Sequence, residues 1–132
     1  MPKPRTPLLA VDPLIIYKSK LILFRRKKPP FQDQLAIPGG SVKVGETTEN
    51  ACVRVAKEKT NMDVKITKLI GVFSDPKRDP RGHTISIAYL CEPLTEVETP
   101  IDTLEIVPIA QHSLQNLAFD HNEMIRASGI LK

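Results

Sequence analysis

The amino-acid sequence predicts an α/β or α+β fold in which helices cover a mixed β-sheet. Apolar, β-branched runs bounded by turn residues outnumber the helical segments. One segment without glycine or proline, at 47–60, predicts a helix in the middle of the chain, and a second helical segment lies near the end. The 132 residues, 41% of them hydrophobic, suit one core without repeats or linkers, so we expect a single domain over 1–132.

The predicted strands follow in order along the chain. Residues 8–26 predict two strands joined by a tight turn, with Pro13 at an edge or bulge because proline donates no hydrogen bond. A short strand is expected at 35–40, and others at 64–73, 84–90 and 104–109. Isoleucine and tyrosine alternate with small or polar residues over 84–90, which predicts a strand buried on one face.

The two predicted helices have start and stop signals. Thr47 and Thr48 are candidate N-caps of the first helix, and Glu49 suits its positive end. The final helix is expected at 121–128, before Gly129. Its expected start is a capping box of Asp120 with Glu123, a hydrophobic staple of Phe119 with Met124, and His121 in the local capping.

Composition excludes several classes of protein. The net charge of +4 comes from scattered bases, the densest run is at 25–28, and there are two Tyr, four Phe and no Trp, so nucleic-acid binding is not expected. Cys52 and Cys91 lack a zinc or disulfide spacing and are expected to be buried, reduced thiols. No apolar run is long enough to span a membrane, and we expect a cytoplasmic protein.

The segment from Gly39 and Gly40 to Glu46 leads into the first predicted helix. A glycine loop before a helix exposes backbone N–H groups to an anion, and diphosphate suits such a site, although most such loops merely turn the chain.

From Gly40 onward the chain resembles the signature of the Nudix hydrolases, G-x5-E-x7-R-E-U-x-E-E-x-G-U with U apolar. The matching residues are Gly40, Glu46, Arg54, Ala56, Glu58 and Met62. The preceding segment 35–40 is similar to the usual lead-in of the family. The segments 74–83 and 117–121 are similar to segments of the ADP-ribose-cleaving members and of related ADP-ribose-sensing regulators. The resemblance implies an α/β/α sandwich with a mixed central sheet, a small-molecule ligand of the nucleoside diphosphate class, and Mg²⁺ or Mn²⁺ as cofactor.

The chain departs from this signature at Val55 and Lys59, where the family has glutamates, and at Asn61 in place of glycine. Positions 55, 58 and 59 share one helix face, so Glu58 is the one acid kept there. One unit-charge pair at 4 Å is worth about 4 kcal/mol at a dielectric of 20, so lysine at 59 strongly opposes a metal ion. We therefore expect a degenerate box with a weak or absent metal site, and restored glutamates at 55 and 59 to strengthen it.

The resemblance also implies roles for residues outside that face. Glu58 is the expected metal ligand, and Glu46 is a second ligand or the partner that orients Arg54. The residues expected to contact the substrate are Gly39, Gly40, Arg25, Arg78, Arg81 and His83. Two replacements for the lost acids stay open: a carboxylate from Glu96, Glu98, Asp102 or Glu105, or the Lys59 ammonium bound to a phosphate oxygen, if it is not merely solvated.

The sequence thus predicts a protein that hydrolyses or binds a nucleoside diphosphate derivative of the ADP-ribose type. Hydrolysis would be a metal-assisted attack by water on the diphosphate. The alternative is a binding or sensing module that has lost turnover, and whether the chain is an enzyme stays open. Homodimers are common among proteins of this kind.

Overall fold

The computed structural model describes residues 5–95, 104–109 and 117–130, and its seven strands form one mixed sheet. The strand bounds are β1 (Leu8–Tyr17), β2 (Lys20–Arg25), β3 (Leu35–Ala36), β4 (Gly40–Ser41), β5 (Val64–Phe73), β6 (Thr84–Pro93) and β7 (Leu104–Pro108). The order is β3-β2-β1-β6-β5, with β4 beside β1 and β7 beside β2. The β1–β6 pair is parallel and the other pairs are antiparallel, so the predicted mixed sheet is confirmed.

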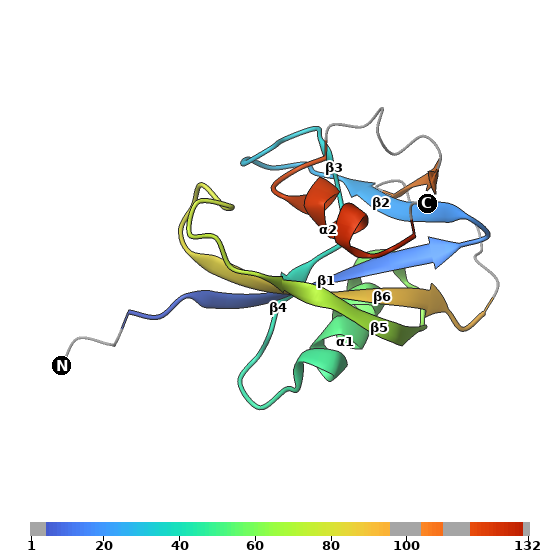
Figure 1. Ribbon diagram of the computed structural model, residues 1–132, viewed down its shortest axis with the longest axis horizontal. Coiled ribbons are helices and arrows are strands. Elements are labelled where there is room, and N and C mark those ends of the chain that lie inside the picture. Colours follow the sequence, from blue (N-terminus) through green and yellow to red (C-terminus); the bar gives the residue numbers. More distant parts are fainter. Residues whose placement is uncertain (1–4, 96–103, 110–116, 131–132) are drawn as a thin grey trace.

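One helix covers each face of the sheet (Figure 1). Helix α1 (Thr48–Thr60) packs Ala51, Cys52, Val55 and Ala56 into one apolar cluster with residues of β1, β2 and β6. Helix α2 (His121–Ala127) contributes Met124 and Ile125 to a second cluster on the other face. The predicted layering of helix, sheet and helix is therefore confirmed.

The strands differ from the sequence predictions in two places. The strand expected at 35–40 is divided: Leu35–Ala36 pairs with β2, whereas Gly40–Ser41 pairs with β1. The strand expected at 84–90 is present within β6, but the prediction that only one of its faces is buried was wrong, because Ser86 and Ala88 on the other face are fully buried. Strand β6 lies between β1 and β5, with an apolar cluster on each face, so alternation of side chains did not mark a solvent face.

Helix α1 starts and ends as its sequence predicts. The Thr47 hydroxyl accepts a hydrogen bond from the Asn50 N–H at 3.0 Å, which caps the helix. Thr48 is already helical, and its hydroxyl lies 2.6 Å from that of Tyr89. The helix ends at Asn61, whose φ of 60° explains why asparagine is tolerated there in place of glycine.

The capping box predicted for α2 was wrong. The Asp120 side chain makes no cap hydrogen bond and instead accepts two from Arg78, while Glu123 pairs with Arg126. Phe119 was expected to pack against Met124 as a hydrophobic staple. Its ring instead packs against Phe31, with 4.7 Å between the two ring centres.

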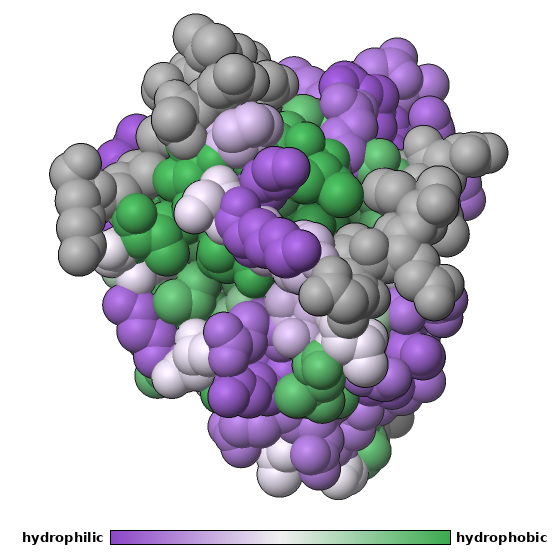
Figure 2. Space-filling view, turned by 90° about the vertical axis from the view of Figure 1, so that its right-hand side faces the viewer, coloured by the Kyte–Doolittle hydropathy of each residue, from purple (hydrophilic) through white to green (hydrophobic). Residues whose placement is uncertain are grey.

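The surface side drawn in Figure 2 mixes apolar and polar residues, as folded proteins commonly do. Neither helix of the described residues is long and apolar enough to cross a membrane. Cys52 and Cys91 are buried and unoxidised as predicted, with their sulfurs 3.7 Å apart between α1 and β6.

Candidate functional site

A cavity of about 950 Å³ opens where β1 begins, β2 ends and α1 finishes. The loop before β6 and the segment before α2 complete its wall. Seven cationic side chains line it against three carboxylates: Arg25, Arg26, Lys27, Lys28, Lys59, Arg78 and Arg81, against Asp12, Glu58 and Asp79. The enclosed surface therefore favours an anionic ligand.

Arg54 joins the loop before α1 to the helix. Its Nε lies 2.6 Å from Glu46 Oε2 and its Nη2 lies 2.8 Å from Oε1, which confirms the predicted pairing. Its Nη1 lies 3.1 and 3.2 Å from the two Glu58 oxygens. The hydrogen bond from Arg54, aided by the Lys43 N–H, lowers the pKa of Glu46 to about 2. Glu46 does not line the cavity, and both predicted metal ligands share one guanidinium.

The helix face expected to carry the metal is divided between core and cavity. Glu58 and Lys59 line the cavity, but Val55 is 1% exposed and belongs to the apolar cluster beneath α1. The expectation that position 55 faces the ligand together with 58 and 59 was therefore wrong. The described residues contain no group of three or more His, Cys, Asp or Glu that could hold a metal ion. The donors present there do not fit the Mg²⁺ or Mn²⁺ cluster that the resemblance implied.

Gly39 and Gly40 both line the cavity, and the absence of a side chain lets the backbone of each lie close to a neighbouring residue of the protein. A Cβ on Gly39 would lie 2.2 Å from Asp12 Oδ1, and one on Gly40 would lie 3.0 Å from Val55 Cγ2. Residues 42–50, which include the start of α1, do not line the cavity. The sequence-based idea of an anion at that helix N-terminus is not supported by this placement, since the C-terminal end of α1 is the end at the cavity.

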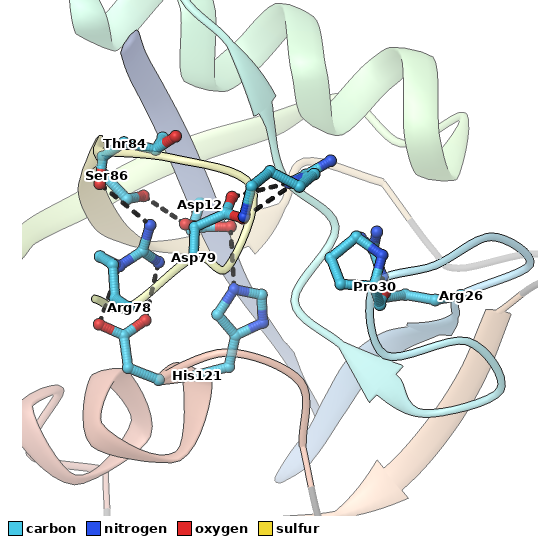
Figure 3. A network of polar contacts seen from close by, with 10 residues as sticks. Asp12, Arg26, Pro30, Arg78, Asp79, Thr84, Ser86 and His121 are labelled. Carbon is cyan, nitrogen blue, oxygen red and sulfur yellow. Dashed lines mark hydrogen bonds and ion pairs between the residues drawn. The ribbon is translucent and has the colours of Figure 1, made fainter. Parts of the chain in front are cut away.

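A buried polar network lies beneath the cavity, and Figure 3 shows Asp12 at its centre between Ser86 and His121. Asp12 Oδ2 accepts a hydrogen bond from the Ser86 hydroxyl, and Oδ1 lies 3.5 Å from His121 Nε2. His121 Nδ1 accepts the Ile37 N–H at 2.9 Å, so the ring is not part of a helix cap as expected. This network was not predicted from the sequence, although the charged Asp12 inside the apolar run of β1 is a signal of it.

Burial lowers the pKa of His121, and the nearby guanidiniums of Arg78 and Arg26 lower it further. The carboxylates of Asp12 and Asp120 oppose this shift without cancelling it. The imidazole is therefore neutral at ordinary pH, with Nδ1 accepting and Nε2–H directed toward Asp12.

Arg78 was expected to grip the ligand, but its side chain is 5% exposed and holds the wall together. Its Nε and Nη2 lie 2.9 and 2.7 Å from the two Asp120 oxygens, so the pair is bidentate. Burial lowers the pKa of Arg78, but the hydrogen bonds and charge of Asp120 outweigh burial and raise it. In Figure 3, Arg78 lies between Thr84 and α2, and it ties the loop before β6 to the start of α2.

Two other arginines, Arg26 and Arg81, both contact the ring of Phe119. The guanidinium carbons of Arg26 and Arg81 lie 4.9 and 5.6 Å from the centre of the Phe119 ring. Burial lowers the pKa of Arg26, and the positive charge of Arg81 lowers it further. Arg81 also pairs with Asp79, at 2.8 Å between Nη2 and Oδ2, and its side chain is 60% exposed.

The remaining predicted residues have structural partners. Arg25 lines the cavity, but its Nε lies 2.6 Å from Glu105 Oε2. His83 also lines the cavity, with Nε2 3.0 Å from the Ser74 carbonyl oxygen. Of the carboxylates considered as replacements, Glu105 is thus paired with Arg25, whereas Glu96, Glu98 and Asp102 lie outside the described residues.

Comparison with known proteins places these features in a family context. The family model of the NUDIX domain matches residues 7–128. The chain is 42% identical over 121 residues to an ADP-ribose pyrophosphatase of Methanocaldococcus jannaschii, covering 91% of this chain and 72% of the relative. It is 28% identical to the ADPR responsive transcriptional repressor NtrR of Acinetobacter baylyi, over 92% of this chain and 52% of the repressor.

The fold is also shared with a solved structure, the NUDIX domain of Shewanella oneidensis NrtR complexed with ADP ribose. The TM-score is 0.78 at 23% identity, covering 94% of this chain and 87% of that one. At this identity the likeness concerns the fold.

Proposed function

Since the chain belongs to the NUDIX domain family, we propose that its cavity binds a nucleoside diphosphate derivative of the ADP-ribose type. The excess of cationic over acidic side chains in the lining is the observation that carries this proposal. A diphosphate brings negative charge into a partly enclosed space, where guanidinium and ammonium groups bind it through charge-assisted hydrogen bonds. The 42% identical ADP-ribose pyrophosphatase supports the choice of ligand class.

The residues have different parts in this proposal. Arg26 and Arg81 line the cavity and contact the Phe119 ring, and we assign the diphosphate to these two guanidiniums. Arg81 would share its guanidinium between the ligand and Asp79. Gly39 and Gly40 let the backbone beside the cavity approach Asp12 and Val55 closely. Arg25, Arg78 and His83 position the wall through their protein partners.

Hydrolysis of the bound diphosphate is the second candidate activity, because the 42% identity extends over 91% of the chain. Water would attack one phosphorus and the bridging oxygen would leave, giving two phosphate monoesters such as AMP and ribose 5-phosphate. Glu58 is the one carboxylate of α1 that lines the cavity, and we propose it as the acid–base group or cation ligand of this reaction. Its bonds to Arg54 oppose that role and favour binding without turnover.

Two measurements test these candidates. ADP-ribose is titrated into the protein in a calorimeter, and AMP release is followed with Mg²⁺ or Mn²⁺ present. Saturable binding without AMP supports the binding module, whereas AMP release abolished by Glu58→Gln supports the enzyme. Glu92→Gln is the matched control, because Glu92 makes a surface ion pair with Lys65 and does not line the cavity. Absence of binding to ADP-ribose would contradict the proposed function.

The broader expectations are proposals too. We propose that residues 1–132 act as one domain in the cytoplasm and that nucleic acid is not the ligand. A homodimer is proposed from the resemblance, and its test is the molecular mass in solution.

A further inference from the structure

The described carboxylates of the cavity already have partners within the protein. Glu58 contacts Arg54, and Asp79 accepts three hydrogen bonds from Arg81. Asp12 accepts from Ser86 and lies against His121. A divalent cation entering the cavity would have to compete with these partners and with the surrounding cations for each oxygen.

Lys59 differs from these paired groups. It is exposed on the last turn of α1, and its Nζ lies 5.9 Å from the centre of the Phe24 ring. No carboxylate among the described residues forms an ion pair with it. An ammonium above an aromatic face keeps N–H donors for another partner, and the negative end of the helix dipole favours a cation there.

Lys57 also lies in the last turn of α1, but it is paired and does not line the cavity. Its Nζ lies 3.5 Å from Asp63 Oδ2. Substitution of Lys59 therefore removes a charge from the cavity, whereas substitution of Lys57 removes a charge from the same helix turn outside the cavity.

Two further cations, Arg26 and Arg81, line the same cavity as Lys59. Arg26 and Arg81 share the Phe119 ring, and the pKa of Arg26 is lowered by burial and then by the charge of Arg81. The pKa of Arg81, in contrast, is raised by its hydrogen bond to Asp79. An anion beside Arg26 would stabilise the charged form of this guanidinium.

We infer that this cavity binds the diphosphate group without a divalent cation, and that Lys59 supplies the fixed positive charge at the end of α1. The inference rests on the proposed function for the rest of the ligand, the nucleoside and sugar. For the diphosphate itself it rests on the paired carboxylates and the placement of Lys59.

The test uses calorimetric titration of the full chain with two ligands, inorganic pyrophosphate and the α,β-methylene analogue of ADP-ribose, which resists cleavage of the diphosphate. Each titration is run in EDTA and again in Mg²⁺. The proteins are the wild type, Lys59→Gln, Lys59→Arg and the control Lys57→Gln. Thermal unfolding confirms that each variant is folded, which is expected because both lysines are exposed.

We expect the wild type to bind both ligands in EDTA with a Kd within about twofold of that in Mg²⁺. Lys59→Gln should raise the Kd in EDTA about tenfold, the discounted effect of one exposed charge near a polyanion. Lys59→Arg should recover most of the affinity, and Lys57→Gln should leave it unchanged. Added salt should weaken wild-type binding more than it weakens binding to Lys59→Gln.

The outcomes separate this inference from the proposed function. Binding of the ADP-ribose analogue that requires Mg²⁺ and ignores Lys59→Gln would overturn the inference and keep the proposed function. If pyrophosphate binds in EDTA and this binding depends on Lys59, but the ADP-ribose analogue binds no more tightly than pyrophosphate, the inference stands and ADP-ribose is not the ligand. If neither ligand binds in EDTA, the inference is wrong.

Discussion

Replacing Gly39 by alanine tests how the buried network and the cavity floor are built. The new Cβ would lie 2.2 Å from Asp12 Oδ1 and 3.1 Å from the Val11 carbonyl oxygen, closer than side chains tolerate. Asp12 must then move by about 1 Å to reach ordinary van der Waals contact. It cannot do so and keep both its bond from Ser86 and its contact with His121.

The cost follows from those two contacts. Each buried polar group left without its partner costs about 1–3 kcal/mol, so the loss of both contacts in Gly39→Ala should lower the free energy of unfolding by about 2–6 kcal/mol. With an unfolding entropy of about 2.1 cal/mol/K per residue, this corresponds to a Tm lower by about 7–20 °C. Far-UV circular dichroism during heating and urea titration measures both quantities.

Gly71→Ala is the matched control, because its Cβ would meet Phe73 at 3.6 Å, an ordinary contact. This variant should stay within about 0.5 kcal/mol of the wild type. If Gly39→Ala unfolds at the wild-type temperature, the close approach to Asp12 does not explain the glycine, and a role in ligand contact becomes the better account.

Three further predictions concern the helix and the buried charges. Val55→Glu should destabilise the protein by about 3 kcal/mol, because it removes a buried apolar side chain and buries a carboxylate, whereas Val53→Glu on the exposed side of α1 should change stability little; urea titration compares them. Arg78→Ala should cost about 2–4 kcal/mol, and adding Asp120→Ala should recover part of that loss because no unpaired buried charge remains; a double-mutant cycle measures the coupling. The native His121 binds its proton at a lower pH than the unfolded chain does, so stability should fall as pH drops below about 6.5, by up to about 1.4 kcal/mol per pH unit; His121→Gln should flatten this slope in urea titrations between about pH 5 and 6.5.

Local signals in the sequence were sufficient for most of the fold. The turn at 18–20, the helix at 47–60 with its Thr47 cap, and the strand at 64–73 follow from turn residues, capping and apolar runs. The burial of both faces of β6 did not follow, because it depends on which strands and helices lie beside it. Alternation along one strand carries no information about its neighbours.

The site was predictable where its residues are close in the sequence. The pairing of Arg54 with Glu46 spans eight positions around one helix start, and the resemblance to the Nudix signature suggested it. The pair of Arg78 with Asp120 joins positions 42 apart, and local sequence signals predicted other roles for both residues, a ligand contact for Arg78 and a helix cap for Asp120. A charged residue can satisfy several plausible roles, and the three-dimensional contacts decide among them.

The two departures on α1 have different physical consequences, although both remove an acid. Val55 faces the apolar cluster and meets Gly40, so a glutamate there would have to turn out of the core or be buried at a cost. Lys59 faces the cavity and places a charge where an anion would lie. Restoring a glutamate at 55 is thus a change to the core. The expectation that a restored glutamate strengthens metal binding therefore stays a prediction for position 59. A cavity that keeps its cations, while its remaining acids are paired within the protein, is better suited to hold a diphosphate than to collect the metal ion that would accompany it.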